Sequence, residues 1–377
     1  MNRKITQTAL GVLLLAGMPA VSADTLVRIG QASPLTGPIS RAGKDIDNGA
    51  RLAIEDLNKM GWRIGGQPVR WELVSEDDVA DPRTATIVAQ KLVDMKVNGV
   101  VGHETSGASI PASRIYSDAG IPQISPSATN PKYTRQGFKT TFRLVANDEQ
   151  QGGAMGRFSF QTLKGKRFAL IDDRSAYGQG LVAEVEKSLQ GSPASVVARE
   201  YGTEKTTDWM AVLTAIRSKN PDVIVYGGMD ATAAPLLQQM RRLGMKANLV
   251  LGDGACSSDM IELSGNVLDS RVYCTEAGLP ADKMSKGADF YKRFKARFGV
   301  EVNIYAPYAY DAVMALAHAM KAADSTEPAR YLPFLAKLKM SGVIGPVEFD
   351  PNGDIKHAAV TVKQYQSGQW KPVSVVR

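Results

Sequence analysis

Hydroxyl-bearing residues and glycines gather in turns that directly follow hydrophobic runs of this sequence. The run at residues 97–101 is followed by GHETSG at residues 102–107, and an amphipathic stretch begins near Ile110. A turn of this kind between a strand and a helix can serve two purposes. Its hydroxyls can cap the helix, or they can join the free N–H groups of the helix in holding an anion such as a carboxylate.

The same pattern recurs in further turns. Those in the first half of the chain supply hydroxyls and glycines, and those in the second half supply Tyr177, Met229, Asp230 and Asp253. Hydroxyls for a carboxylate and an acid for an ammonium suit a small zwitterion. For any single turn, helix capping, or an acid placed to interact with the helix dipole, is a better explanation than ligand binding. The whole set of turns together favours a ligand pocket. The turns are SPLTGPISRAG (33–43), GHETSG (102–107), SPSATNP (125–131), DDRSAYGQG (172–180), GGMDATA (227–233) and GDGACSS (252–258).

The elements that must position these turns are strands alternating with helices. Such a series predicts a parallel sheet with helices on both faces, with ligands beyond the carboxyl ends of the strands. A second series starts after Asn147 without a Pro- or Ser-rich linker, which predicts two lobes. The tail at residues 343–373 has turn signals and predicts hairpins. Strands are predicted at 27–32, 69–74, 97–101, 122–125, 167–171, 195–199, 223–226 and 249–251, and helices at 43–60, 82–95, 110–116, 148–163, 179–190, 207–218, 231–243, 284–298 and 306–322.

Length and composition restrict the class of protein. A chain of 377 residues with 44% hydrophobic and 22% charged residues is globular and long enough for two domains. The formal charge of +7 is spread along the chain. Because no dense block of lysine and arginine is interleaved with aromatics, nucleic acid is not an expected partner.

Residues 1–23 have the pattern of a secretory signal peptide. Basic residues near the start precede an apolar run at residues 9–16 and a cleavage pattern at residues 21–23. Met18 stands where a lipoprotein would need cysteine. We therefore expect a periplasmic protein that begins near Asp24 after cleavage and carries no lipid anchor.

Cys256 and Cys274 are the two cysteines of the chain. An isolated pair in an oxidising compartment usually forms a disulfide, so a bridge is predicted, with two buried free thiols as the alternative. A metal site is not expected, because the chain has three histidines and none has a partner at ligand spacing.

In their order and spacing, several stretches resemble the periplasmic branched-chain amino-acid-binding proteins, which are type I solute-binding proteins of ABC transporters. The resemblance runs from about residue 25 nearly to the C-terminus. It implies an α/β fold of two Rossmann-like lobes that close over a ligand. The stretches are GPISRAGKDIDNGARLAIEDLN, EDDVADP, VVGHETSGASIPAS, GIPQISPSATNP, YGQG, VYGG and GPVEFDPNGD.

The resemblance also implies how the chain is divided. The two lobes of the family are joined by three crossings, which here fall near residues 146–149, 276–279 and 358–362. Lobe 1 would then comprise residues 24–147 and 278–359. Lobe 2 would comprise residues 148–277 and 360–377.

Site residues follow from the resemblance position by position. The carboxylate-binding turn of the family falls on Thr105 and Ser106, and its second hydroxyl turn falls on Ser127 and Thr129. The remaining matches place an aromatic from the opposite lobe on Tyr177, the acid that receives an ammonium on Asp253, and an aromatic of the side-chain pocket on Tyr305.

This sequence departs from the family at four of the pocket positions. Ala42 and Met229 stand where aromatics are common, and Glu104 occupies an apolar position beside the carboxylate turn. Asp253 is one methylene shorter than the usual glutamate. The scaffold is therefore expected to be kept while the wall of the pocket differs.

Two enzymatic interpretations compete with binding. The stretch YGQGLVA from Tyr177, with Glu200 further on, fits the dinucleotide pattern G-x-G-x-x-A, but four residues separate it from the end of the preceding strand, so the glycines are expected to serve the helix start. His103 and Ser106 lie close in sequence, but there is no G-x-S-x-G elbow, and the sequence shows no orienting acid.

The sequence therefore predicts an extracytoplasmic solute-binding protein without catalysis or cofactor. Its partners would be an amino acid, branched-chain or related, and the membrane permease of an ABC transporter, and the protein would be a monomer. The alternative is an extracytoplasmic receptor for another small carboxylate or amide on the same fold.

Overall fold

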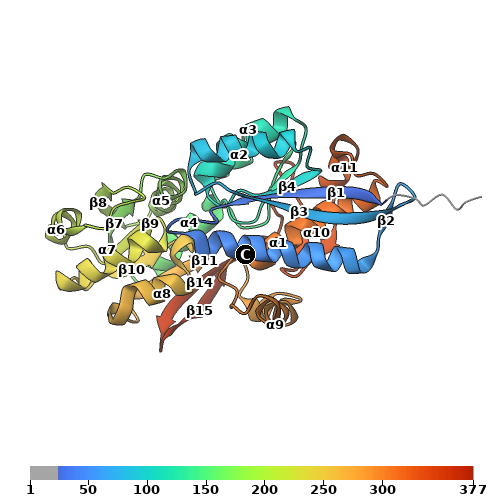
Figure 1. The fold of residues 1–377 in the computed structure, drawn as a ribbon. Coiled ribbons are helices and arrows are strands. Elements are labelled where there is room, and N and C mark those ends of the chain that lie inside the picture. The colour runs from blue at the N-terminus through green and yellow to red at the C-terminus, as the bar shows by residue number, and fades with distance from the viewer. Residues whose placement is uncertain (1–23, 377) are drawn as a thin grey trace, which may run out of the picture.

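The computed structural model describes residues 24–376, so the predicted signal peptide lies outside the described residues. Two sheets with helices packed on their faces organise this part of the chain (Figure 1). Among the helices of residues 24–376, none combines the length and the apolarity that a membrane crossing requires.

The first sheet is parallel except for one short edge strand. Its central strand β1 pairs in parallel with β3 on one side and β4 on the other, while β2 pairs antiparallel with β3. Because the chain order reverses at β1, the carboxyl ends of β1 and β4 form the switch point where ligands bind in such sheets. In spatial order the strands are β2 (Arg63–Ile64), β3 (Gln67–Asp77), β1 (Thr25–Ser33), β4 (Gly99–Gly102), β5 (Gln123–Ser125) and β6 (Thr141–Arg143).

Side chains alternate along these strands and enter two cores. Val27 and Ile29 pack with α1 and α10 on one face, and Ala32 and Val100 pack with α2 and α3 on the other. In Figure 1, α2 and α3 lie above β1, while α1 and α10 lie below. The helices of this unit are α1 (Ser40–Met60), α2 (Pro82–Asp94), α3 (Ser106–Asp118), α9 (Gly287–Phe298), α10 (Ala306–Ala322) and α11 (Pro328–Leu335).

Local sequence explains where α2 begins and where α1 ends. Asp81 caps α2, since its side chain accepts from the amides of Arg83 and Thr84 while Pro82 occupies the first helical position. The helix α1 ends at Gly61, whose φ of 60° is the left-handed conformation that glycine adopts without strain.

The second sheet combines a parallel half with an antiparallel hairpin. Strand β7, next to the edge strand β8, pairs in parallel with β8 and β9, and β14 adds antiparallel to β11. The hairpin predicted around residues 367–368 is present as β14 and β15. In spatial order the strands are β15 (Gln369–Val376), β14 (Val360–Gln366), β11 (Val272–Glu276), β10 (Asn248–Leu251), β9 (Val223–Gly227), β7 (Arg167–Asp172) and β8 (Ser195–Tyr201).

The second sheet also separates two cores by the alternation of its side chains. Ala169 and Ile171 pack with α6 and α7, and Phe168 and Leu170 pack with α5. Its helices are α4 (Asp148–Gln161), α5 (Ala176–Leu189), α6 (Met210–Ser218), α7 (Asp230–Arg242) and α8 (Ser258–Ser264). The short hairpin β12 (Met340–Ser341) and β13 (Pro346–Val347) belongs to neither sheet.

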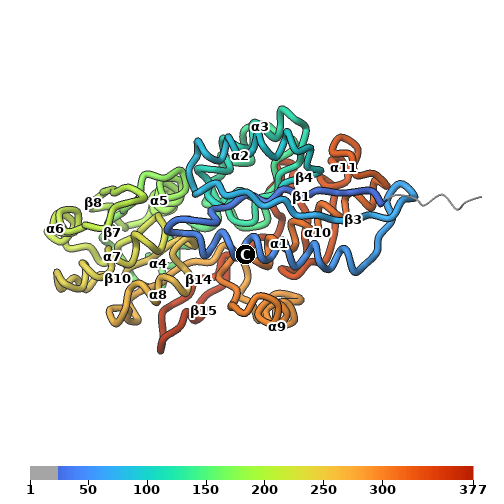
Figure 2. Tube along the Cα trace, in the orientation of Figure 1, coloured from blue at the N-terminus to red at the C-terminus, as the bar shows by residue number. Residues whose placement is uncertain are grey.

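The chain passes between the two sheets after β6, after β11 and before β14. Hydrogen bonds tie these passages together: the amide of Ala146 donates to Ala277 (3.0 Å), and Thr361 donates to the carbonyl of Gly278 (2.7 Å). Figure 2 shows the late segment with α10 beside the N-terminal α1. We propose that the two sheet units are the lobes predicted above, with residues 24–147 and 278–359 in lobe 1.

A disulfide joins Cys256 to Cys274, which confirms the predicted bridge. Cys274 lies in β11, and Cys256 ends a short 3-10 turn at Asp253–Ala255 that follows β10. The bridge therefore anchors the turn that carries Asp253 to the neighbouring strand.

Replacing both cysteines by alanine should lower the free energy of unfolding by roughly 3 kcal/mol, because the bridge closes a loop with a sequence separation of 18. Denaturant titration of the double variant and the oxidised protein measures this difference. Equal stabilities, or two reactive thiols in the denatured protein without reductant, would contradict the bridge.

Candidate functional site

The ten residues predicted for the ligand site meet in the cleft between the two sheets. They line two small adjoining cavities that share Glu104, Met229, Gly254 and Tyr305. Their role in binding remains a prediction, but their convergence is a feature of the fold. The ten are Ala42, Glu104, Thr105, Ser106, Ser127, Thr129, Tyr177, Met229, Asp253 and Tyr305.

The turn before α3 combines both roles considered for it. Thr105 is the helix cap, because its hydroxyl accepts from the amide of Ala108 (3.2 Å). Ser106 reaches instead to the next turn, where its hydroxyl accepts from the amide of Asn130 (3.2 Å). The amides of Ser106 and Gly107 belong to the first turn of α3, where N–H groups have no acceptor within the helix. The lining of the cavity thus includes the positive end of a helix dipole.

The second hydroxyl turn, residues 127–129, is attached to the first. Ser127 donates to the backbone carbonyl of Glu104 (2.8 Å), and Ser125 donates to the carbonyl of His103 (2.8 Å). Thr129 completes the lining on this side of the cavity. The two hydroxyl turns therefore form one connected surface at the carboxyl ends of β4 and β5.

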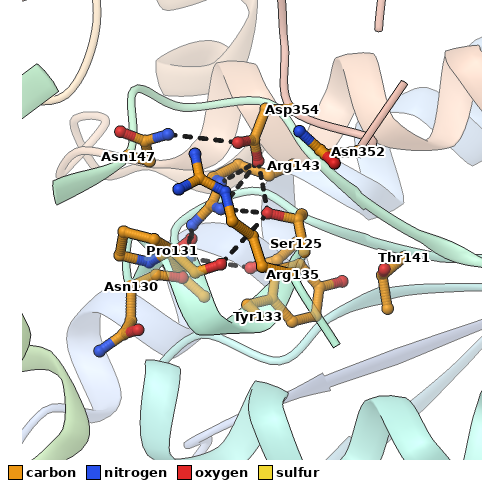
Figure 3. Close-up of polar contacts among 12 residues, drawn as sticks. Ser125, Asn130, Pro131, Tyr133, Arg135, Thr141, Arg143, Asn147, Asn352 and Asp354 are labelled. Carbon is orange, nitrogen blue, oxygen red and sulfur yellow. Dashed lines mark hydrogen bonds and ion pairs between the residues drawn. The ribbon is translucent and has the colours of Figure 1, made fainter. Parts of the chain in front are cut away.

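A buried ion pair holds this surface in place (Figure 3). Arg143, fully buried at the end of β6, donates to the carbonyls of Ala128 (2.8 Å) and Asn130 (3.0 Å) and pairs with Asp354 (2.7 Å). Asn147 donates to the other oxygen of Asp354 (3.2 Å). Burial raises the pKa of Asp354, but the positive charge of Arg143 and the hydrogen bonds from Arg143, Thr134 and Asn147 together outweigh it, so the pKa lies below its usual value.

Asp253 is the buried acid on the opposite side of the cavity. Its carboxylate accepts from the hydroxyls of Tyr177 (2.8 Å) and Tyr305 (2.9 Å) and from the amide nitrogen of Gln151 (3.0 Å). Burial raises its pKa, and these donors counteract that rise in part. Asp253 does not cap the next helix, since Ser257 caps α8.

Three further carboxyl groups, those of Glu104, Asp230 and Asp259, line the cavities. Glu104 is buried, and its Oε2 has no hydrogen-bond partner among residues 24–376. Burial raises the pKa of Glu104 well above its usual value, and the nearby negative charges, Asp78 and Asp230 among them, raise it further. Asp230 accepts from the hydroxyl of Ser257 (2.7 Å), and burial raises its pKa to about 6.

Three contacts join the two sheet units across the cleft. Tyr305, at the start of α10, reaches Asp253 of the second unit, and Asn130 donates to the carbonyl of Ala176 (2.6 Å). At the rim, the Arg41 side chain of α1 pairs with Asp259 and Glu262 of α8. The cleft is therefore closed in this structure.

The geometry does not support the hydrolase interpretation. An acid that the sequence did not reveal does orient His103, because Asp78 lies 2.6 Å from its Nδ1. The other ring nitrogen faces the hydroxyl of Tyr116 (3.1 Å), so both nitrogens have partners other than Ser106. All three side chains of this group are buried beneath the turn.

The glycines of the dinucleotide-like stretch allow α5 to pack closely against its neighbours. A Cβ on Gly178 would lie 2.4 Å from the carbonyl oxygen of Gly227, and one on Gly180 would lie 2.4 Å from the side chain of Asn130. The amide of Gly178 is also capped by Ser175. These glycines let α5 approach β9 and the first unit closely.

Sequence reasoning missed the residues that support the site. Their partners are far away in the sequence: Gln151 contacts Asp253, and Arg143 contacts Asp354, in both cases about 100 or more positions apart. Only the turn that Arg143 also holds is nearer in the sequence. The stretch FDPNGD around Asp354 was a usable signal, but it does not reveal the partner. Nothing in the pattern around Arg143 marks it.

Comparison with known proteins identifies the family. A sequence model described as "Periplasmic binding protein" matches residues 26–369. A Leu/Ile/Val-binding protein homolog from Brucella abortus (strain 2308) is 35% identical over 347 residues, which is 92% of this chain and 91% of that protein. The leucine-specific-binding protein of Salmonella typhimurium is 31% identical over 370 residues, which is 97% and 98% of the two chains.

Solved structures share the fold. A leucine-binding protein from Thermotoga maritima superposes with a TM-score of 0.86 at 27% identity and covers 93% of this chain and 98% of its own. A branched-chain amino acid substrate-binding protein of Streptococcus pneumoniae, in complex with isoleucine, superposes with a TM-score of 0.85 at 27% identity. The match covers 93% of this chain and 99% of that protein. The predicted α/β fold of two lobes, that of type I periplasmic binding proteins, is therefore confirmed, and the chain belongs to the periplasmic binding protein family.

Proposed function

We propose that this protein is the extracytoplasmic solute-binding component of an ABC importer, which captures an amino acid in the cleft and delivers it to a membrane permease without catalysis. One observation carries the proposal: a buried acid, Asp253, faces the amino end of α3 across one cavity. An amino acid presents the complementary pair of charges.

The two ends of the cavity suit the two ends of a zwitterion. The amides and hydroxyls of Ser106 and Thr129 supply donors and a positive dipole end for a carboxylate. Asp253 supplies a counter-charge for an ammonium, which a desolvated cation requires. Its Oδ2 accepts from Tyr305 alone among the described residues, so this oxygen can take a further donor.

The relatives support the class of ligand. Their names describe proteins that bind leucine, isoleucine and valine, and one solved structure holds isoleucine. We extend to this chain the amino-acid class and the permease partner. The extracytoplasmic location, the cleaved signal peptide and the monomeric state belong to the same proposal.

Closure of the cleft is the proposed mechanism. A ligand between α3 of lobe 1 and Asp253 of lobe 2 touches both only when the lobes are shut, so it shifts the population toward the closed form. The contacts of Tyr305 with Asp253 and of Arg41 with Asp259 form only in that state. The permease would then recognise the closed form.

One observation favours the alternative receptor for another carboxylate or an amide. Asp253 already accepts three hydrogen bonds from protein groups. A carboxylate satisfied in this way can remain buried without an ammonium beside it. The substitutions of Ser106, Thr129 and Asp253 separate the two functions.

Ser106→Ala and Thr129→Ala should each weaken amino-acid binding by roughly 1.5–3 kcal/mol, because each removes a hydrogen bond to a charged carboxylate. Titration calorimetry on ligand-stripped protein measures the loss. Ser117→Ala, in the last turn of the same helix, is the matched control and should bind as the unaltered protein does. Unchanged affinity in both site variants would remove these hydroxyls from the site.

Asp253→Asn should cost an amino-acid ligand several kcal/mol of affinity, since a buried ammonium loses its counter-charge. Asp253→Glu, which keeps the charge, should retain part of that affinity. Affinity and melting temperature are measured together in both variants. Intact affinity in Asp253→Asn would end the ammonium role and favour a ligand that carries only a carboxylate or an amide.

A further inference from the structure

The second cavity adjoins the proposed amino-acid site and is walled by carboxylates. Glu104, Asp230 and Asp259 line it together with the small side chain of Ala42. We call these three carboxylates the acidic subsite. Glu104 also lines the first cavity, so the acidic subsite continues directly from the site of Asp253. Among the described residues, no lysine, arginine or histidine lines either cavity.

Glu104 has an unmet hydrogen-bonding capacity that points to a ligand. The residue is 4% exposed, and its Oε2 has no partner among residues 24–376. A buried carboxylate oxygen without a donor is costly, and the great majority of such groups in folded proteins are paired. A donor that a ligand brings into the cavity would satisfy this oxygen.

The other two carboxylates are engaged only in part. Asp230 receives the hydroxyl of Ser257, a neutral donor that leaves its charge uncompensated. Asp259 pairs with Arg41, whose side chain is about half exposed at the rim of the cleft and lines neither cavity. Inside the closed cleft, neither Glu104 nor Asp230 therefore has a positively charged partner among the residues that line the cavities.

The arrangement suits an organic cation better than a metal ion. No group of three or more acidic, histidine or cysteine side chains in residues 24–376 converges closely enough to hold a metal ion. An ammonium or guanidinium, by contrast, offers several donors spread over its head group and can bridge separated carboxylates. The methyl side chain of Ala42 leaves the adjoining space open to such a head group.

We propose that the acidic subsite binds a distal cation of the ligand, so that the substrate class is the basic α-amino acids, with an ammonium or guanidinium at the end of the side chain. This inference rests on the proposed amino-acid function. The α-carboxylate lies at the amino end of α3, the α-ammonium at Asp253, and the distal cation between Glu104 and Asp230. The mutual repulsion of these carboxylates, which contributes to the raised pKa of Glu104, is relieved by the cation.

Calorimetry on ligand-stripped protein tests the proposal with lysine, arginine, norleucine, leucine and glutamine. Norleucine is lysine without its distal ammonium, and glutamine offers a neutral donor. Lysine or arginine should bind about 10–100-fold more tightly than norleucine, as expected for hydrogen bonds to a charged group. Glu104→Gln should reduce the ratio of lysine to norleucine affinity at least about tenfold.

Asp118→Asn, which removes an exposed carboxylate from the last turn of α3, is the matched control and should keep the ratio. Equal or tighter binding of norleucine or leucine than of both basic amino acids would overturn the distal cation and leave amino-acid capture intact. Preference for glutamine would overturn it in favour of a neutral donor. Binding of none of the five would overturn the proposed function itself.

Discussion

The buried ion pair between Arg143 and Asp354 is the constraint on which the candidate site depends. A fully buried guanidinium must be paired, since breaking such a pair costs roughly 3–5 kcal/mol. Asp354 provides the counter-charge, and the carbonyls of Ala128 and Asn130 and the hydroxyl of Thr134 accept the remaining donors of the guanidinium. Thr129 lies between these two carbonyls in sequence, so the same pair that satisfies a buried charge also fixes a hydroxyl of the proposed carboxylate site.

The pair also connects the two sides of the cleft. Asn147 donates to Asp354 and, as the cap of α4, fixes where the first helix of the second sheet unit begins. One turn later Gln151 both donates to Asp253 and accepts from its amide. The acid of one lobe and the hydroxyl turn of the other are thus positioned from a single passage of the chain. A passage held at both ends lets the lobes move as bodies while each half of the site stays ordered.

The sequence predicts the alternating strands and helices of this fold well, and it predicts the long-range side-chain contacts poorly. Strands such as β7 and β9 are continuous apolar runs, and turns rich in hydroxyls mark the helix starts, so local patterns suffice there. β6 and β11 were not predicted, because RVYCTE and TFR carry no clear alternation. Most of the ten site residues converge because they follow strand ends, which meet at one edge of each sheet, whereas Ala42 and Tyr305 come from α1 and the start of α10. Gln151, Asp78 and Asp354 were missed because their partners are set by tertiary packing, which no local pattern encodes.

The charges inside the cleft affect the free energy of the closed form. Burial raises the pKa of Asp230, which lines the second cavity, to about 6, and it raises the pKa of the buried Asp148 at the start of α4 to about 8. An ionised carboxylate is therefore unfavourable at these positions. Closure without a ligand must therefore be accompanied by proton uptake or by the full cost of desolvation. A ligand with an ammonium at Asp253 supplies one compensating charge, and a distal cation at Glu104 supplies another. On this argument, the charge of the ligand contributes to closure together with its shape, because a compensating charge lowers the free energy of the shut state.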